Sequence, residues 1–122
     1  MAARSEFVDH LQDMLAPLGD VRFRAMFGGH GVYLDGVMFG LIADETLYLK
    51  VDDDNRAQFE AAGMGPFVYR HASRPPTAMS YYQAPPDAME DAPALLDWVR
   101  SAAAAAFRAD AAKPQKKRKA KG

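Results

Sequence analysis

The chain has 122 residues, about the size of one domain, and contains no cysteine. Hydrophobic residues make up 49% and charged residues 25%, as in an ordinary soluble globular protein, and no apolar run is long enough to cross a bilayer. This composition excludes disulfides, thiolate metal sites and a cysteine nucleophile. The N-terminal segment has acids where a signal peptide needs an apolar core, which predicts a cytoplasmic protein without membrane contact.

The formal net charge of −1 conceals an uneven distribution. Residues 113–122 carry six basic groups and no acid, which leaves nine basic and sixteen acidic groups in residues 1–112, a net charge of −7. Because a block of like charges cannot form a core, we predict a globular domain over 1–112 and a disordered basic tail over 113–122. Such a tail can attract nucleic acid by counterion release, or it can serve only as a solubilising extension. Its basic residues are Lys113, Lys116, Lys117, Arg118, Lys119 and Lys121.

The first predicted elements are a helix and a strand. Ser5 is a candidate N-cap, and apolar residues follow it at helical spacing until Pro17 and Gly19 end the helix. Residues 21–27 then alternate between apolar and basic or polar positions, which predicts a strand with one wetter face.

The dipeptide Asp35-Gly36 lies between two apolar runs. It is a strong signal for a two-residue β-hairpin, because a type I′ turn needs positive φ at both positions. A regular register from this turn places Gly31 opposite Gly40, leaving a bare patch that another group can approach. The same register pairs Leu34 with Val37, Tyr33 with Met38, and Val32 with Phe39.

Five glycines lie close together in this part of the chain. A phosphate-binding loop needs a glycine motif between a strand and a helix, whereas GGHG leads into a predicted strand. We therefore interpret the glycines as structural, serving turns and close packing. They are Gly28, Gly29, Gly31, Gly36 and Gly40.

A second tight turn is predicted at Asp44-Glu45, followed by a strand over 46–51 and three consecutive aspartates, Asp52, Asp53 and Asp54. A calcium loop counted from the first aspartate would need glycine at its sixth position and glutamate at its twelfth. Those positions hold Ala57 and Gly63. We expect the aspartates to cap a short helix instead, with Gly63 at its C-terminal cap.

The remaining predicted elements are two strands and a helix. The strands cover 67–71 and 77–82, with residues 72–76 as a loop. The closing helix has Asp91 as N-cap, Pro93 in its first turn, and a broad apolar face. That face is formed by Leu95, Leu96, Trp98, Val99, Ala103, Ala106 and Phe107. The order of elements predicts an α+β domain whose N-terminal and C-terminal helices pack on a mainly antiparallel sheet.

With these elements in place, four runs of sequence resemble the TfoX N-terminal domain family, found in the TfoX (Sxy) regulators of natural competence. The runs are RAMFGGHGVYLDGVMFGLIADETLYLKVD, FEAAGM, MSYY and LLDWVRSA, within residues 5–108. The resemblance implies an α+β fold like that of type III secretion chaperones. It also implies a regulatory rather than catalytic role, with the transcription machinery or another regulator as partner. Full-length regulators of this kind also carry a second, helical domain.

The residues themselves predict no catalytic set. The histidines lack the spacing of HxH or HExxH, and the serines lack the GxSxG context of an activated nucleophile. We therefore predict no catalytic residue, no metal ligand and no cofactor. The residues considered are His10, His30, His71, Ser5, Ser73, Ser80 and Ser101.

One candidate interaction face can be assembled from the predicted strands. It combines Arg22 and Arg24 with Lys50 and with Tyr81 or Tyr82, and it suits a partner protein or an anionic ligand. In the alternative interpretation these side chains merely cover the outer side of the sheet.

Three function classes follow. We prefer a non-catalytic regulatory or protein-interaction domain, and the sequence is compatible with a homodimer. The first alternative is an accessory nucleic-acid-binding protein that acts through the basic tail. The second is a small ligand-binding domain or an enzyme whose site the sequence does not reveal.

Overall fold

The computed structural model describes the backbone of residues 6–26, 29–71 and 74–112, and the side chains of these residues apart from 69–79. The predicted N-cap Ser5, the glycine Gly28, the serine Ser73 and the basic tail 113–122 lie outside this description.

The predicted terminal helices are confirmed. Helix α1 covers Glu6–Leu15 and continues into a 3₁₀ turn, η1 (Ala16–Leu18), which contains Pro17. Helix α3 covers Ala92–Ala111, and the carboxylate of its N-cap Asp91 accepts the N–H of Ala94 at 3.4 Å. A second 3₁₀ turn, η2 (Pro86–Glu90), precedes it.

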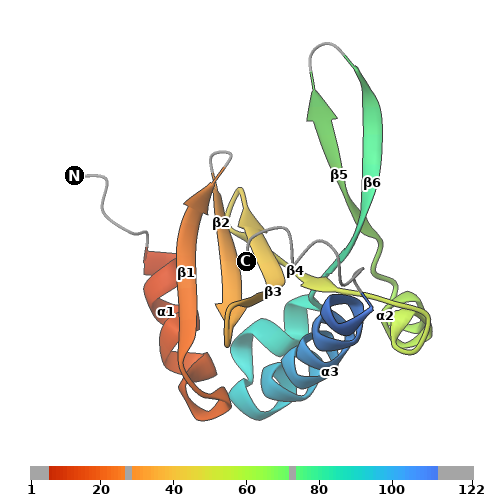
Figure 1. Cartoon of the computed structure of the whole chain (residues 1–122). Helices are drawn as coiled ribbons and strands as arrows, with labels where there is room; N and C mark the ends of the chain where they lie inside the picture. Colours follow the sequence, from red (N-terminus) through yellow and green to blue (C-terminus); the bar gives the residue numbers. More distant parts are fainter. Residues whose placement is uncertain (1–5, 27–28, 72–73, 113–122) are drawn as a thin grey trace, which may run out of the picture.

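All six strands form one antiparallel sheet in the order β1-β2-β3-β4-β6-β5 (Figure 1). Between β4 and β5 lies a short helix, α2 (Arg56–Ala61), and Gly63 at φ +82° ends it as predicted. Strands β1 and β5 are the two edges of the sheet. The strands are β1 (Val21–Met26), β2 (Gly29–Leu34), β3 (Val37–Ala43), β4 (Thr46–Lys50), β5 (Pro66–His71) and β6 (Arg74–Gln83).

One face of the sheet, called the inner face here, is covered by helices. Val8 and Leu11 of α1, Phe59 of α2, and Leu95 and Val99 of α3 are almost fully buried in one hydrophobic core with the inward side chains of the strands. In the part of the chain that the structure describes, α1, α2 and α3 all contribute to this core. Among the described residues, no helix covers the opposite, outer face (Figure 1).

The predicted type I′ turn is present, but the register beyond it differs. Asp35 and Gly36 have φ values of +54° and +81°, and Tyr33 lies opposite Met38 as expected. A β-bulge then shifts the pairing, so Val32 lies opposite Gly40 and Gly31 opposite Leu41. The predicted pairing of Gly31 with Gly40, and of Val32 with Phe39, is wrong.

The bulge has a physical reason in the next hairpin. Ile42 pairs with Leu47 and both belong to the core, whereas Leu41 pairs with Tyr48 and is buried outside the core cluster. A regular register would turn Leu41 inward and Ile42 outward, because side chains alternate along a strand. The extra residue in β3 corrects this, since a bulge changes which side the following residues face.

The loop predicted at residues 72–76 is wrong for its last three residues, because β6 already begins at Arg74 and includes Pro75 and Pro76. Strand β4 pairs only with Tyr81–Gln83 of β6, so the N-terminal part of β6 pairs with β5 alone. Proline, which lacks an N–H, is tolerated where a strand has no second neighbour. The β5–β6 hairpin consequently projects from the body of the protein (Figure 1).

The closing helix also departs from prediction at one residue. Phe107 was expected on the apolar face but is 38% exposed. The buried residues of the last turns are Ala102, Ala103, Ala105 and Ala106, and the next position rotates about 100° away from the sheet.

Gly40 lies where there is little room for a side chain. A Cβ atom there would be 3.1 Å from the carbonyl oxygen of Tyr48 and 3.4 Å from a methyl group of Leu49. We expect Gly40→Val to lower the free energy of unfolding by about 1 to 3 kcal/mol, because the backbone of β4 cannot move aside cheaply. A denaturant melt measures the change.

The matched control is Gly65→Val. A Cβ at Gly65 would meet nothing within 4 Å, so we expect a change within about 0.5 kcal/mol. An unchanged or raised melting midpoint for Gly40→Val would mean that this part of the sheet is open rather than packed.

Candidate functional site

The outer face brings together most of the predicted interaction residues. Arg22 and Arg24 project from β1, Lys50 from β4 and Tyr81 from β6, on the side of the sheet opposite the core. The outer face therefore carries two separate cationic regions, one on β1 and one on β4. These four residues and their outward-pointing neighbours lie on the outer face.

Tyr82, also predicted for this face, lies on the other side. Its ring meets Phe59 edge-on at 6.1 Å, and its hydroxyl donates to the Glu60 carboxylate at 3.2 Å. Neighbouring residues of a strand point to opposite faces, so only one of two consecutive tyrosines can join the outer face. That one is Tyr81.

Each of two cations on the outer face lies against a tyrosine ring. The guanidinium carbon of Arg24 lies 5.6 Å from the ring centre of Tyr33, and the ammonium nitrogen of Lys50 lies 5.2 Å from that of Tyr81. The negative face of an aromatic ring attracts a cation and holds it in place. Arg22 instead donates to the Asp20 carboxylate at 3.0 and 3.2 Å.

Tyr81 is the most enclosed polar side chain of the outer face, with 8% of its surface exposed. Burial, together with a smaller contribution from the nearby Tyr33 phenol, raises the pKa of its hydroxyl to about 12. The hydroxyl therefore remains a neutral hydrogen-bonding group at physiological pH.

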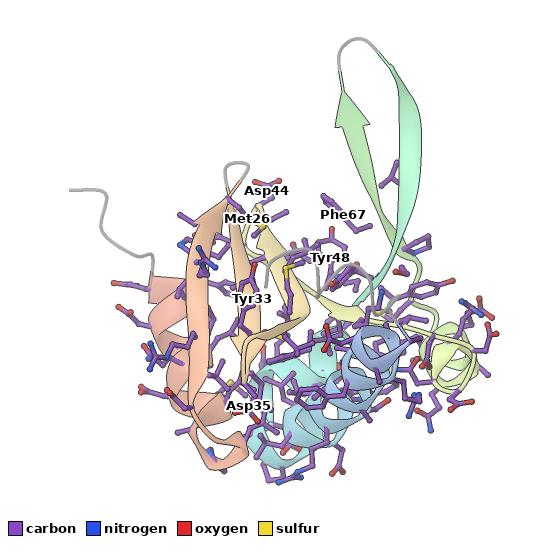
Figure 2. The ribbon with its side chains drawn as sticks, viewed as in Figure 1. Met26, Tyr33, Asp35, Asp44, Tyr48 and Phe67 are labelled. Carbon is purple, nitrogen blue, oxygen red and sulfur yellow. The ribbon has the colours of Figure 1, made fainter. Side chains whose placement is uncertain are left out.

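Other aromatic and sulfur-containing side chains complete the face (Figure 2). The rings of Tyr48 and Phe67 are 4.8 Å apart, and Met26 and Met38 flank the site of Gly31 together with Tyr33. We did not predict Tyr33 or Tyr48 from sequence. The signal was present, since Tyr33 lies directly opposite Arg22 and Tyr48 lies two residues before Lys50.

A depression of about 760 Å³ opens at the β1 edge of the sheet. Arg22, Phe23 and Arg24 line it from β1, and Tyr33 and the Asp35-Gly36 turn line it from the neighbouring hairpin. Gln12 of α1 borders it on the inner side. The depression combines cationic, aromatic and hydrogen-bonding groups.

A smaller depression of about 370 Å³ lies between α2 and α3 and is lined by Gln58, Asp97, Trp98 and Ser101. Its acid, Asp97, pairs with Arg100 at 3.6 Å. The Trp98 ring packs against Phe59 at 4.8 Å. Asp97 and Trp98 are thus already engaged in contacts within and between the helices.

Within the described ranges, no group of three or more histidine, aspartate or glutamate side chains could hold a metal ion. His10 lies on α1, His30 on β2 and His71 on β5. The absence of a metal ligand, which the sequence indicates, therefore stays a prediction.

One serine has a basic neighbour, since Lys50 donates to the Ser80 hydroxyl at 2.8 Å. The ammonium nitrogen of Lys50 also lies 5.2 Å from the ring centre of Tyr81, so Lys50 contacts two neighbouring residues of β6.

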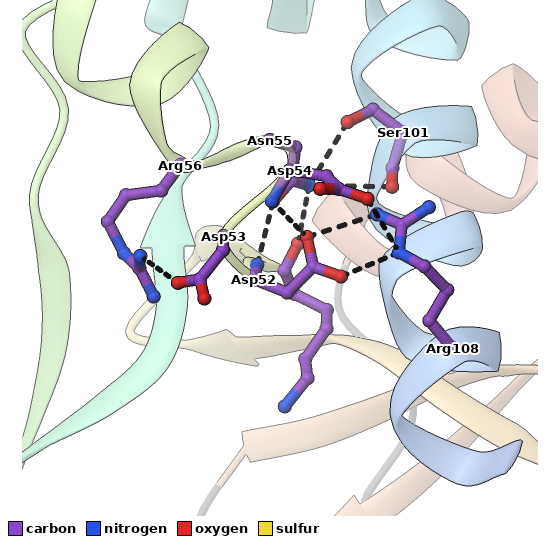
Figure 3. Close-up of polar contacts among 8 residues, drawn as sticks. Asp52, Asp53, Asp54, Asn55, Arg56, Ser101 and Arg108 are labelled. Carbon is purple, nitrogen blue, oxygen red and sulfur yellow. Dashed lines mark hydrogen bonds and ion pairs between the residues drawn. The ribbon is translucent and has the colours of Figure 1, made fainter. Parts of the chain in front are cut away.

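The acidic run after β4 has a different role from the predicted one (Figure 3). The N-cap of α2 is Asn55, which has no side-chain cap hydrogen bond, but Asp52 accepts the backbone N–H of Asp54 at 3.0 Å in the turn that leads into the helix. Asp52 accepts two hydrogen bonds from the Arg108 guanidinium, at 2.8 and 3.0 Å, and Asp53 pairs with Arg56 at 2.7 Å. The hydrogen bonds from Arg108 hold the pKa of Asp52 below its usual value.

Asn55 joins this run to the core and is 3% exposed. Its side-chain oxygen accepts the N–H of Asp52 at 2.7 Å. Its amide donates to the Lys50 carbonyl at 3.1 Å and to the Ser101 hydroxyl at 3.0 Å. Asn55 therefore ties the end of β4 to α3. No local sequence pattern indicates this contact, which spans 46 positions.

We expect Asn55→Ala to lower the free energy of unfolding by about 1 to 3 kcal/mol, because buried groups would lose their hydrogen-bond partners. Asp53→Ala is the matched control. The Asp53 side chain is 95% exposed, so its removal should change stability by about 0.5 kcal/mol or less. Equal melting curves for the two variants would refute the anchoring role of Asn55.

Two comparisons with known proteins agree with this structure. The family model of the TfoX N-terminal domain matches residues 13–106. A protein of Spirochaeta aurantia, named "Uncharacterized 12.7 kDa protein in trpE 5'region", is 33% identical over 106 residues, covering 86% of this chain and 84% of its own length. The α+β fold implied by the sequence resemblance is confirmed, while the likeness to type III secretion chaperones stays a prediction. No helix in the described ranges is long and apolar enough to span a membrane. The chain belongs to the TfoX N-terminal domain family.

Proposed function

We propose that this chain is a non-catalytic regulatory domain that works by binding another protein through its outer face. The observation that carries the proposal is the one-sided sheet: α1, α2 and α3 share the inner core, and the outer face keeps its cation–tyrosine pairs at the surface. Membership of the TfoX N-terminal domain family supports the regulatory part.

The composition of the outer face favours a protein partner. Tyrosine, methionine and arginine are the residue types enriched at the centres of protein interfaces. Here they are represented by Tyr33, Tyr48, Met38 and Arg24, all at least partly accessible. Because the two cations rest on rings, they lose little side-chain freedom when a partner binds.

The test is affinity capture with the full chain and a charge-reversed double variant, Arg24→Glu with Lys50→Glu. We expect the variant to lose the partner by about tenfold or more in affinity, as for central interface residues. Arg100→Glu is the control, because Arg100 lies on α3 and is 55% exposed. The control should retain the partner. If all three proteins capture the same partners equally, the outer face is not the binding surface.

A second candidate function is accessory binding of nucleic acid. It is favoured by the six basic groups of residues 113–122, and by the absence of acids in residues 61–86, which include the projecting β5–β6 hairpin. The body as a whole opposes it, since residues 1–112 carry a net charge of −7.

Replacing the six tail cations with glutamine in the full chain tests this function. We expect duplex DNA binding to be weak, to fall steeply with salt, and to disappear in the variant. Sequence-specific, salt-resistant binding by the variant in a mobility-shift assay would show instead that the globular body reads DNA.

A further inference from the structure

The middle of the outer face is an apolar and aromatic surface that lies between two cations. Tyr33 of β2, Met38 of β3 and Tyr48 of β4 point away from the core there and are half-buried. The two tyrosines are labelled in Figure 2. Arg24 lies beside this surface on β1, and Lys50 lies at the end of β4. A partner therefore meets apolar and charged groups on the same surface.

The backbone beneath this surface cannot accept a further strand. Strands β2 and β3 each have a hydrogen-bonded strand on both sides, so an occupant of the face cannot extend the sheet. A segment that covers apolar side chains loses water from its own N–H and C=O groups, which must then pair within the segment. An α-helix meets this requirement because its backbone hydrogen bonds are internal, whereas an extended segment does not.

The width of the surface also matches a helix. Neighbouring strands lie about 4.8 Å apart, so three spacings separate β1 from β4 by about 14 Å. A helix with its side chains is about 10 to 12 Å wide. A helix that lies along β2 and β3 therefore has Arg24 on one flank and Lys50 on the other.

We propose that the outer face binds an amphipathic helix of a partner protein, with an acidic side chain on each flank of the helix's apolar stripe. This inference rests on the proposed function and names the chemistry of the partner. The apolar stripe packs on Tyr33, Met38 and Tyr48, and the acids meet Arg24 and Lys50. Aromatic and methionine side chains are suited to this packing, because they adapt to the apolar face of a helix.

Arg24 is the principal anchor of such a helix. It is exposed, its guanidinium lies 5.6 Å from the ring centre of Tyr33, and no carboxylate among the described residues is paired with it. A carboxylate that reaches Arg24 makes a charge-assisted hydrogen bond, which is stronger than a neutral one. Lys50 keeps its hydrogen bond to the Ser80 hydroxyl and contributes its charge to the other flank.

The turns at the two ends of β3 limit where the helix carries its acids. Asp35 lies in the turn before β3, and Asp44 and Glu45 lie in the turn after it, and all three are exposed. Acids at the ends of the helix would meet like charges there. The seven residues of β3 span about 20 Å, which is the length of about 14 helical residues. The helix that fits is thus about four turns long, with its acids in the central turns.

This chain does not itself supply such a helix among its described residues. Helices α1, α2 and α3 turn their apolar faces into their own core, and Phe107 is the one large hydrophobic side chain that they expose by more than a third. Residues 113–122 carry six basic groups and no acid, which is the wrong sign for a surface that presents Arg24 and Lys50. The fitting occupant is therefore a helix of a different protein.

Fluorescence anisotropy with the full chain tests the proposal, using three labelled peptides of about 14 residues at about 0.15 M salt, where charges more than about 8 Å apart are screened. The first peptide has leucines at helical spacing, one glutamate on each flank of the leucine stripe in its central turns, and alanine and glutamine elsewhere. The second has lysine in place of both glutamates. The third is the first with proline in place of a central alanine, which breaks the helix. We expect the first to bind about tenfold more tightly than either other peptide.

The decisive variant is Arg24→Glu with Lys50→Glu, and Arg100→Glu is the matched control. Arg24→Glu alone should remove most of the preference for the glutamate peptide, and the double variant should bind the lysine peptide more tightly. The control should keep the wild-type preference. Four results would each overturn the proposal: no binding of the glutamate peptide, equal binding of the helical and proline peptides, an unchanged preference in the double variant, or dimerisation of the chain that the double variant abolishes.

The proposed function fails separately. If the glutamate peptide does not bind but capture of the natural partner is lost in the double variant, the outer face remains the interaction surface and only the acidic helix is refuted. If capture is unaffected by Arg24→Glu and Lys50→Glu together, the proposed function fails whatever the peptides do.

Discussion

The junction between the end of β4, the acidic run and α3 depends on the buried side chain of Asn55. It is the one polar residue that is fully buried among those the structure describes, and its hydrogen bonds join the last residue of β4, the acidic run and Ser101 of α3. A buried amide needs partners on both its oxygen and its nitrogen, so these segments can meet in few other ways. The outer pair of Arg108 with Asp52 closes the same junction from the solvent side.

Fixing α3 at this junction has a consequence on the far side of the sheet. Helices α3 and α1 meet over the inner face. Because side chains alternate along each strand, the hydrophobic residues of the strands form two sets. One set joins the helix core. The other, which includes Leu41 and Tyr81, is buried on the outer face by the strands' own side chains, with Arg24 and Lys50 at the margins resting on rings. In the described part of the chain, a sheet with helices on one face only thus presents residue types common in interfaces on the other.

Local sequence signals predicted much of this fold. The Asp35-Gly36 turn, the N-cap Asp91 and the C-terminal cap Gly63 each depend on a few neighbouring residues, and each is where the sequence indicates. The bulge in β3 was not predicted, because it depends on how two successive hairpins share one core. The role of Asn55 depends on a contact with distant Ser101. For the candidate site, alternation along strands placed Arg22, Arg24, Lys50 and Tyr81 correctly on one face, but the facing of Tyr82 and the contribution of Tyr33 required the actual register.

We propose that the partner meets the outer face rather than the helices. Amide hydrogen exchange of the full chain, measured alone and with its captured partner, tests this most directly. We expect binding to slow exchange in β1, β2 and β4, which carry Arg24, Tyr33 and Lys50 on the outer face, while α1 and α3 keep their exchange rates. Protection confined to α1 or α3, with β1 unchanged, would contradict it.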